Sequence, residues 1–176
     1  MDKLSGNRAA RKLCRMASLL VLAMGLSFLE TLFPLPLPGL KLGLANVVIT
    51  ATFFFCGKGE AATVSLVRTI LCALLFGSFI SFLFSAVGAL FSYLSLWLTG
   101  KGRGRFFSML GISLVSAAAH HVGQLLVAAV LFAPGVIFTY LSLLLFLGIF
   151  TGAFSGFLLL FAEKNLQKIS ENALKS

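Results

Sequence analysis

Two adjacent histidines, His120 and His121, interrupt a long apolar stretch, and other polar residues lie at helical spacing around them. Ser116, His120 and Gln124 are each separated by four residues, which places them on one face of a helix. Imidazole, amide and hydroxyl groups donate and accept hydrogen bonds. This face is therefore expected either to bind a polar solute or to hold the backbone of a neighbouring helix.

Other polar residues stand singly in apolar surroundings, where a charge costs several kcal/mol unless it finds a partner or water. Glu30 and Lys41 are expected either to line a cavity or to form an ion pair that closes a loop. Arg68 is expected to face a buried partner or a bound anion, and Asn46 either lines the cavity or caps a helix. The predicted substrate-binding residues are Glu30, Lys41, Asn46, Arg68, His120, His121, Gln124 and Tyr140.

Signatures of catalysis are missing from the sequence. Asp2 is its only aspartate, so no aspartate-rich magnesium site for diphosphate chemistry can be built. It has no phosphate-binding glycine loop, the histidines lack the carboxylate and thiol partners that specify a metal, and the three cysteines lack metal or redox spacing. We predict a binding protein without catalytic residues, cofactor or metal, whose uphill transport would draw on a partner or an ion gradient.

The composition indicates where these residues must be held. Hydrophobic residues make up 59% and charged residues 11% of the 176 residues, whereas soluble domains are nearer a quarter charged. Apolar runs reach membrane-spanning length, and residues 69–100 carry no charge. A β-barrel is disfavoured because barrel strands alternate at every second residue. The expected fold is an all-α, polytopic integral membrane protein.

Six transmembrane helices fit the apolar runs best. They are expected at residues 13–33, 42–57, 60–77, 80–99, 107–132 and 136–162. The third and fourth are divided only by GSFIS at 77–81, but one helix over 60–100 would be about 60 Å long, twice the hydrocarbon thickness. In this scheme Lys41 lies in an outside loop, Arg68 lies near mid-membrane, and the other predicted site residues share the outer half of the bundle.

Basic residues give this scheme its orientation. The net charge is +9, yet all lysines and arginines except Lys41 and Arg68 fall at the N-terminus, at Lys58, in the 101–105 loop or in the C-terminal tail. Basic residues beside membrane spans resist translocation, so we expect no nucleic-acid partner and place both termini in the cytoplasm. The predicted organisation is a basic cytoplasmic segment at 1–12, a transmembrane domain at 13–163 and a basic cytoplasmic tail at 164–176.

Small residues on the last predicted helix form a second pattern. Gly148, Gly152 and Gly156 repeat at every fourth residue and line one helix face, and small residues let another helix approach closely. Ala23 and Ser27 form a weaker pair on the first helix. Both patterns are expected either to pack within the chain or to dock a partner subunit.

The sequence PLPLPG at 34–39 separates the first two predicted helices. Proline cannot continue a helix and holds the preceding residue extended, so a stiff apolar segment should leave the membrane edge, turn at Gly39 and return through LKLGLAN. Because this segment carries the single cation Lys41, we predict a lid over a polar cavity open to the outside. The alternative is a plain connector at the interface.

The segment FPLPLPGLKLGLAN, between an N-terminal span and a further apolar body, resembles the family named Gx transporter, also labelled heptaprenyl diphosphate synthase component I. That family is similar to the substrate-binding S components of energy-coupling factor (ECF) transporters. The resemblance implies a six-helix uptake subunit whose lid and site include Lys41 and Asn46. It also implies a transmembrane coupling protein and cytoplasmic ATPases as partners. S components often dock through an alanine pair on the first helix, and Ala23 and Ser27 occupy that spacing here.

Together these features predict a substrate-binding subunit of an ECF-type transporter in a bacterial cell membrane, importing a small anionic or amphipathic micronutrient. Two alternatives stay open. One is a noncatalytic membrane partner of a prenyl diphosphate synthase in isoprenoid or quinone metabolism. The other is a solitary ion-coupled carrier.

Overall fold

The computed structural model describes residues 2–33, 40–76, 78–102, 107–132 and 134–175. Across these ranges the chain forms helices and no sheet. In chain order they are α1 (Asp2–Thr31), α2 (Ala45–Phe55), α3 (Lys58–Phe76), α4 (Phe79–Thr99), the short 3-10 helix η1 (Gly100–Gly102), α5 (Met109–Leu131) and α6 (Pro134–Lys175). The predicted all-α fold is confirmed.

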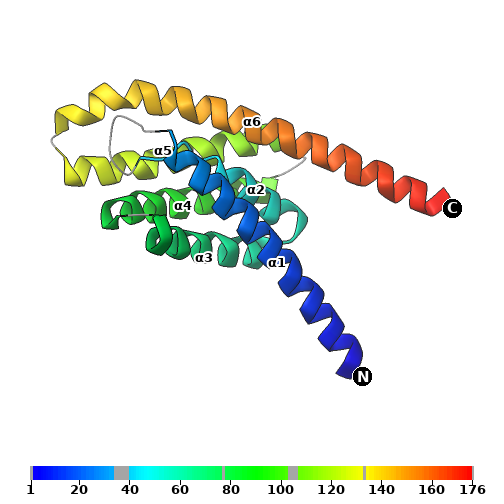
Figure 1. Cartoon of the computed structure of the whole chain (residues 1–176). Coiled ribbons are helices and arrows are strands. Elements are labelled where there is room, and N and C mark those ends of the chain that lie inside the picture. Colours follow the sequence, from blue (N-terminus) through cyan, green and yellow to red (C-terminus); the bar gives the residue numbers. More distant parts are fainter. Residues whose placement is uncertain (1, 34–39, 77, 103–106, 133, 176) are drawn as a thin grey trace.

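The helices form a bundle in which α5 lies between α4 and α6 (Figure 1). The most extensive contacts are those of α5 with α4 on one side and with α6 on the other. At the opposite side of the bundle, α1 packs on α2 and α3. The N-terminal part of α1 and the C-terminal part of α6 both project from the right-hand side of the bundle in Figure 1.

Within the described ranges, five helices are long and apolar enough to cross a membrane by themselves. Their spanning segments are Asn7–Thr31, Lys58–Phe76, Phe79–Gly102, Met109–Leu131 and Tyr140–Asn165. The apolar helix α2 has only 11 residues, or about 16 Å at 1.5 Å per residue, against a hydrocarbon thickness of about 30 Å. The bundle thus contains five or six membrane-crossing helices, and the predicted count of six is met only if α2 crosses with help from the residues before it.

Those residues, 40–44, are not helical, although the sequence predicted a helix from 42 onward. Leu40 is buried against Phe84 and Val127 in the bundle core. Gly43 has a φ of +84°, a conformation that glycine adopts without the steric penalty of a Cβ atom. Leu44 already has helical backbone angles, with φ −57° and ψ −39°, so these residues form a non-helical entry to α2 that turns at Gly43.

The fold-back between α3 and α4 occurs where the sequence predicted it. α3 ends at Phe76, and α4 begins at Phe79. Ser78 caps α4, because its side-chain oxygen accepts a hydrogen bond from the Ser81 backbone N–H at 3.2 Å. This polar cap pairs one of the first backbone amides of α4, which have no partner within the helix.

Two apolar clusters form the core. The first joins Leu40, Phe84, Val127, Ala128 and Leu144. The second joins Ile49, Phe53, Ala61, Val64, Leu96 and Ile112. On α4 and α5 the two clusters occupy opposite ends, so the polar residues at 85–92 and 116–124 lie between them.

The glycine face of α6 packs against α5 of the same chain. A Cβ atom at Gly152 would lie 2.9 Å from the Leu114 Cα atom, and one at Gly156 would lie 2.8 Å from the Leu110 Cα atom. Gly148 similarly makes room for the imidazole of His121. Because α5 covers this face, the geometry favours the intramolecular alternative over partner docking.

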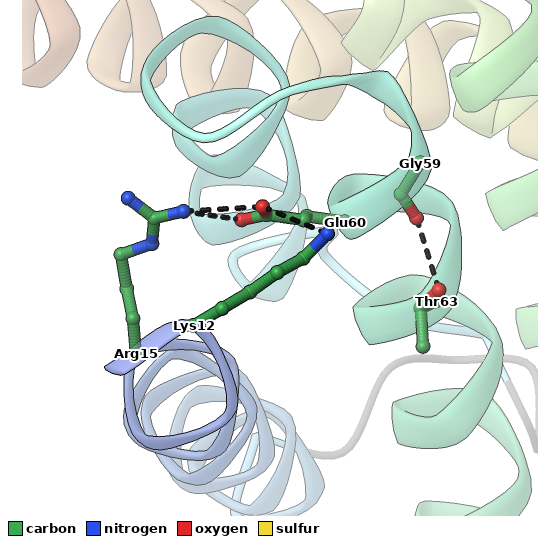
Figure 2. A network of polar contacts seen from close by, with 5 residues as sticks. All are labelled: Lys12, Arg15, Gly59, Glu60 and Thr63. Carbon is green, nitrogen blue, oxygen red and sulfur yellow. Dashed lines mark hydrogen bonds and ion pairs between the residues drawn. The ribbon is translucent and has the colours of Figure 1, made fainter. Parts of the chain in front are cut away.

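An ion-pair cluster joins α1 to α3 at the end of the bundle that carries the basic N-terminal residues. Figure 2 shows Lys12 and Arg15 of α1 converging on Glu60 of α3. Arg15 Nη2 donates to both carboxylate oxygens at 3.1 and 2.9 Å, and Lys12 Nζ lies 3.5 Å from Oε1. These ion pairs join the N-terminal half of α1 to α3. Helix α1 continues without a break through residues 12 and 13, where the sequence predicted a boundary.

Candidate functional site

Buried polar side chains of α1, α3, α4 and α5 lie around the non-helical segment at 40–44, between the two apolar clusters. We call this set the polar layer. It comprises Glu30, Lys41, Arg68, Ser85, His120, His121 and Gln124, all buried except the half-buried Lys41. Six of these seven residues were predicted site residues, and Ser85 was not.

The Gln124 side chain of α5 binds the backbone of the non-helical segment at 40–44. Its side-chain nitrogen donates to the Lys41 carbonyl at 3.2 Å, and its oxygen accepts from the Lys41 N–H at 3.5 Å. The same nitrogen lies 2.8 Å from His120 Nε2. In this arrangement Nε2 accepts, so a neutral His120 carries its proton on Nδ1.

Glu30 and Arg68 bring opposite charges to the layer from α1 and α3. Glu30 Oε1 accepts from the Ala45 N–H at 3.3 Å, where the positive end of the α2 dipole favours a carboxylate. Arg68 Nη1 donates to the Ser27 hydroxyl at 3.1 Å. The charges of Glu30, Lys41 and Arg68 are close enough to act on one another, but neither cation forms an ion pair with Glu30 within 4.0 Å.

Several buried polar atoms of the polar layer lack hydrogen-bond partners. They are Arg68 Nε, Ser85 Oγ and both ring nitrogens of His121, together with Glu30 Oε2 and His120 Nδ1. The last two have backbone groups close by, at Leu44 and at Gly88. Buried polar groups are normally hydrogen-bonded, and leaving one unpaired costs about 1–3 kcal/mol. Such a concentration within one layer is typical of a site that pairs these groups with a polar solute.

The two histidines face different neighbours. A Cβ atom at Gly88 of α4 would lie 2.7 Å from His120 Cε1, so the glycine makes room for this ring. A Cβ atom at Gly148 of α6 would lie 2.9 Å from His121 Cδ2. The two ring centroids are 5.6 Å apart. His120 therefore faces α4 and the non-helical segment at 40–44, whereas His121 faces α6.

Asn46 belongs to a separate network with Ser92 and Ser116. Its Nδ2 donates to the Ser116 hydroxyl at 3.2 Å, and the Ser92 hydroxyl donates to its Oδ1 at 2.8 Å. The two hydroxyl oxygens are 2.7 Å apart, which closes a ring of hydrogen bonds across α2, α4 and α5. Leu44 is the N-cap of α2 and makes no side-chain cap bond, so the alternative in which Asn46 caps this helix is wrong.

Three other predictions concern Tyr140, the lid at 34–39 and the depth of Lys41. Tyr140 packs against the apolar cluster around Phe84 and Leu144. The predicted lid at 34–39 falls outside the described residues. Lys41 lies deeper than the predicted outside loop, because Gln124, which binds its backbone, is seven residues or about 10 Å before the end of α5 at Leu131.

Ser85 and Gly88 were missed, although the sequence contains a signal for them. Ser85, Gly88 and Ser92 are spaced by three and four residues, and these spacings place them on one helix face. Small and polar residues on one face of an otherwise apolar helix are the same kind of pattern as the Ser116, His120 and Gln124 face of α5.

Apolar helices of spanning length around a buried polar layer define a polytopic membrane protein. The chain belongs to the family described as heptaprenyl diphosphate synthase component I, whose sequence model matches residues 19–161. This confirms the family resemblance seen in the sequence. Neither a curated protein nor a solved structure matches the chain.

Proposed function

We propose that this protein is the substrate-binding membrane subunit of an ECF-type transporter and binds a small anionic or amphipathic micronutrient in the polar layer. The observation that carries this proposal is the group of buried, unpaired polar atoms in that layer. Each unpaired polar group is costly in a bilayer, and a bound polar solute would offset that cost.

The charges favour an anionic ligand group. Lys41 and Arg68 provide two cations against the single carboxylate of Glu30. The non-helical 40–44 segment leads into the N-terminus of α2, and half-helix N-termini in transporters face anionic groups of their solutes. Glu30 already occupies the N-terminus of α2, so a carboxylate or phosphate of the ligand would bind beside it, at Arg68 and Lys41.

The test is native mass spectrometry of the protein released from membranes in mild detergent. We expect an additional small-molecule mass on the wild type and its loss in Arg68→Gln, because losing a charged hydrogen bond costs about 1.5–3 kcal/mol, or roughly 10- to 100-fold in affinity. Arg15→Gln removes the same charge outside the polar layer and should retain the mass. Bare protein in all three samples would reject the proposal.

The energy source is tested separately by copurification. An ECF-type subunit should bring down a transmembrane coupling protein and cytoplasmic ATPases. Uptake by the chain alone in liposomes, without an ATPase, would contradict this part of the proposal and support a solitary ion-coupled carrier.

The family description favours a second candidate, a noncatalytic membrane partner of a prenyl diphosphate synthase. Such a partner would receive or supply an isoprenoid at the membrane while the soluble subunit performs the chemistry. Copurification with a soluble prenyl synthase, and not with ATPases, is the expected result for this candidate.

A further inference from the structure

A second candidate binding site, away from the polar layer, lies on α1 at the ion-pair cluster with Glu60. Arg8, Arg11, Lys12 and Arg15 are separated by three, one and three residues, so these four cations share one face of α1. All four are exposed. Among the described carboxylates, only Glu60 forms an ion pair with this face, so the face keeps an excess of positive charge.

The contact with Glu60 holds the Arg15 side chain in place. Only 10% of the Glu60 side chain is exposed, against 50% for Arg15. Both hydrogen bonds to the carboxylate leave from Nη2 of Arg15, and Figure 2 shows the other terminal nitrogen pointing away from it. The guanidinium therefore offers this nitrogen, Nη1, to a further acceptor. Arg11, one turn earlier on the same face, provides a second cation.

The lengths of the helices place these two arginines at the membrane surface. The spanning segment Lys58–Phe76 has 19 residues, or about 28 Å, which is close to the hydrocarbon thickness of about 30 Å. Glu60 lies in the first turn of α3, so its partner Arg15 lies near the edge of the hydrocarbon. Arg11 is four residues, or about 6 Å, further out along α1, which reaches the headgroup layer.

Aromatic residues mark the same level on α4. The Tyr93 hydroxyl donates to the Lys58 carbonyl at 3.1 Å, so Tyr93 lies beside the start of α3. Trp97 is one turn further along α4, and Lys101 Nζ lies 3.7 Å from the centre of its ring. Tyrosine and tryptophan are enriched at membrane–water interfaces. Leu13, on the side of α1 away from the basic face, is 69% exposed, which suits contact with acyl chains.

We infer that Arg11 and Arg15 bind the phosphate group of an anionic phospholipid in the leaflet at this end of the bundle. Guanidinium groups bind phosphate through charge-assisted hydrogen bonds, and basic segments beside a spanning helix attract anionic lipids. The level of the two arginines, between the hydrocarbon and the headgroups, is the level of the lipid phosphates. This inference does not depend on which solute the polar layer binds.

The test is native mass spectrometry of the full-length protein in mild detergent, titrated separately with phosphatidylglycerol and phosphatidylcholine of the same acyl chains. We expect phosphatidylglycerol to bind about tenfold more tightly, because the choline group cancels the charge of its own phosphate. Inorganic phosphate should not displace the lipid, because it lacks the acyl chains. Equal binding of the two lipids would overturn the inference, and displacement by equimolar inorganic phosphate would show a site for soluble phosphate instead.

Variants locate the bound lipid. The double variant Arg11→Gln and Arg15→Gln should weaken phosphatidylglycerol binding by about tenfold or more, the loss expected when hydrogen bonds to charged groups are removed. Its matched control removes two charges elsewhere, at two exposed lysines of α6, and should bind the lipid as the wild type does. This control is the double variant Lys164→Gln and Lys168→Gln.

A variant that keeps the charge tests the geometry. Arg15→Lys should also weaken lipid binding, because a guanidinium bonds Glu60 and a phosphate through different nitrogens, whereas lysine has a single nitrogen. Arg8→Lys is the matched control and should leave binding unchanged. If both lysine variants bind the lipid as tightly as the wild type, the attraction comes from diffuse charge and the site at Arg15 is wrong.

The same spectra separate this inference from the proposed function. Arg68→Gln should lose the small-molecule mass and keep the phospholipid, whereas Arg15→Gln should keep the small-molecule mass and bind the phospholipid more weakly. Loss of the phospholipid in Arg68→Gln alone would place it in the polar layer and overturn the inference. Wild-type lipid binding in the double variant of Arg11 and Arg15 would overturn it as well.

Discussion

The approach of α5 to α4 at Gly123 gives a prediction with a calculable size. A Cβ atom on Gly123 would lie 2.8 Å from the Val87 carbonyl oxygen and 3.0 Å from the Gly88 Cα atom. These are backbone atoms, so no side chain can rotate away. Reaching ordinary contact at 3.4 Å requires Gly123→Ala to move the two helices apart by about 0.6 Å.

The free-energy cost of moving the helices apart is partly offset by the higher helix propensity of alanine. Overpacking by one methyl group costs about 1–3 kcal/mol, whereas replacing glycine by alanine inside a helix gains about 0.8–1.0 kcal/mol. We therefore expect Gly123→Ala to lower the free energy of unfolding by up to about 2 kcal/mol. It should also loosen the polar layer, because His120 is packed against Gly88.

Gly25→Ala is the matched control, since a Cβ atom there has no neighbour within 4 Å. It should be neutral or stabilising by up to about 1 kcal/mol. The assay is thermal unfolding in mild detergent, followed by the fluorescence of Trp97, the only tryptophan. If Gly123→Ala unfolds at the same temperature as Gly25→Ala, the close packing of α4 and α5 inferred here is refuted.

Four further predictions use other features of the structure. Glu60→Gln should lower stability by about 1 kcal/mol or less, because its ion-pair partners are half exposed, and a loss independent of salt concentration in the same unfolding assay would contradict this. Asn46→Ala opens the ring of hydrogen bonds and should cost about 1–3 kcal/mol while the retained ligand mass persists; loss of that mass in a well-folded sample would place Asn46 in the binding site. Gly152→Leu should separate α5 and α6 and broaden the size-exclusion peak. If the variant elutes in a peak as sharp as that of the wild type, this packing of α5 and α6 is contradicted. Lys41→Ala should weaken ligand retention and leave folding nearly intact, because Gln124 binds only the backbone at this position, and unchanged affinity would remove the ammonium group from the site.

The sequence predicted most of the fold, because hydropathy and the residues that start or end a helix are local properties of the sequence. The five long spans and the turn at Ser78 follow from runs of apolar residues and a single cap. The predicted helix began at residue 42, whereas α2 begins at Ala45. Leucines are compatible with a helix and with a non-helical chain, so residue types alone did not reveal the difference. The conformation of residues 40–44 depends on tertiary contacts, namely Leu40 in the core and the positive φ of Gly43.

The candidate site was predictable as a set of residue types but not as a geometry. The spacing of Ser116, His120 and Gln124 correctly indicated one face of α5, yet this face divides between two networks. Ser116 joins the closed ring with Asn46, and Gln124 binds the backbone of Lys41. Whether a polar group is already paired depends on how the helices are rotated, and sequence spacing within one helix contains no information on that rotation.

The bond pair between Gln124 and Lys41 has a consequence for substitutions at position 41. An amide side chain here bonds the N–H and the C=O of a single residue, as a neighbouring strand does in a sheet. The anchorage of position 41 is thus indifferent to which amino acid occupies it. A neutral or acidic side chain at position 41 would therefore change the charge at this point of the polar layer while the backbone stays held in place.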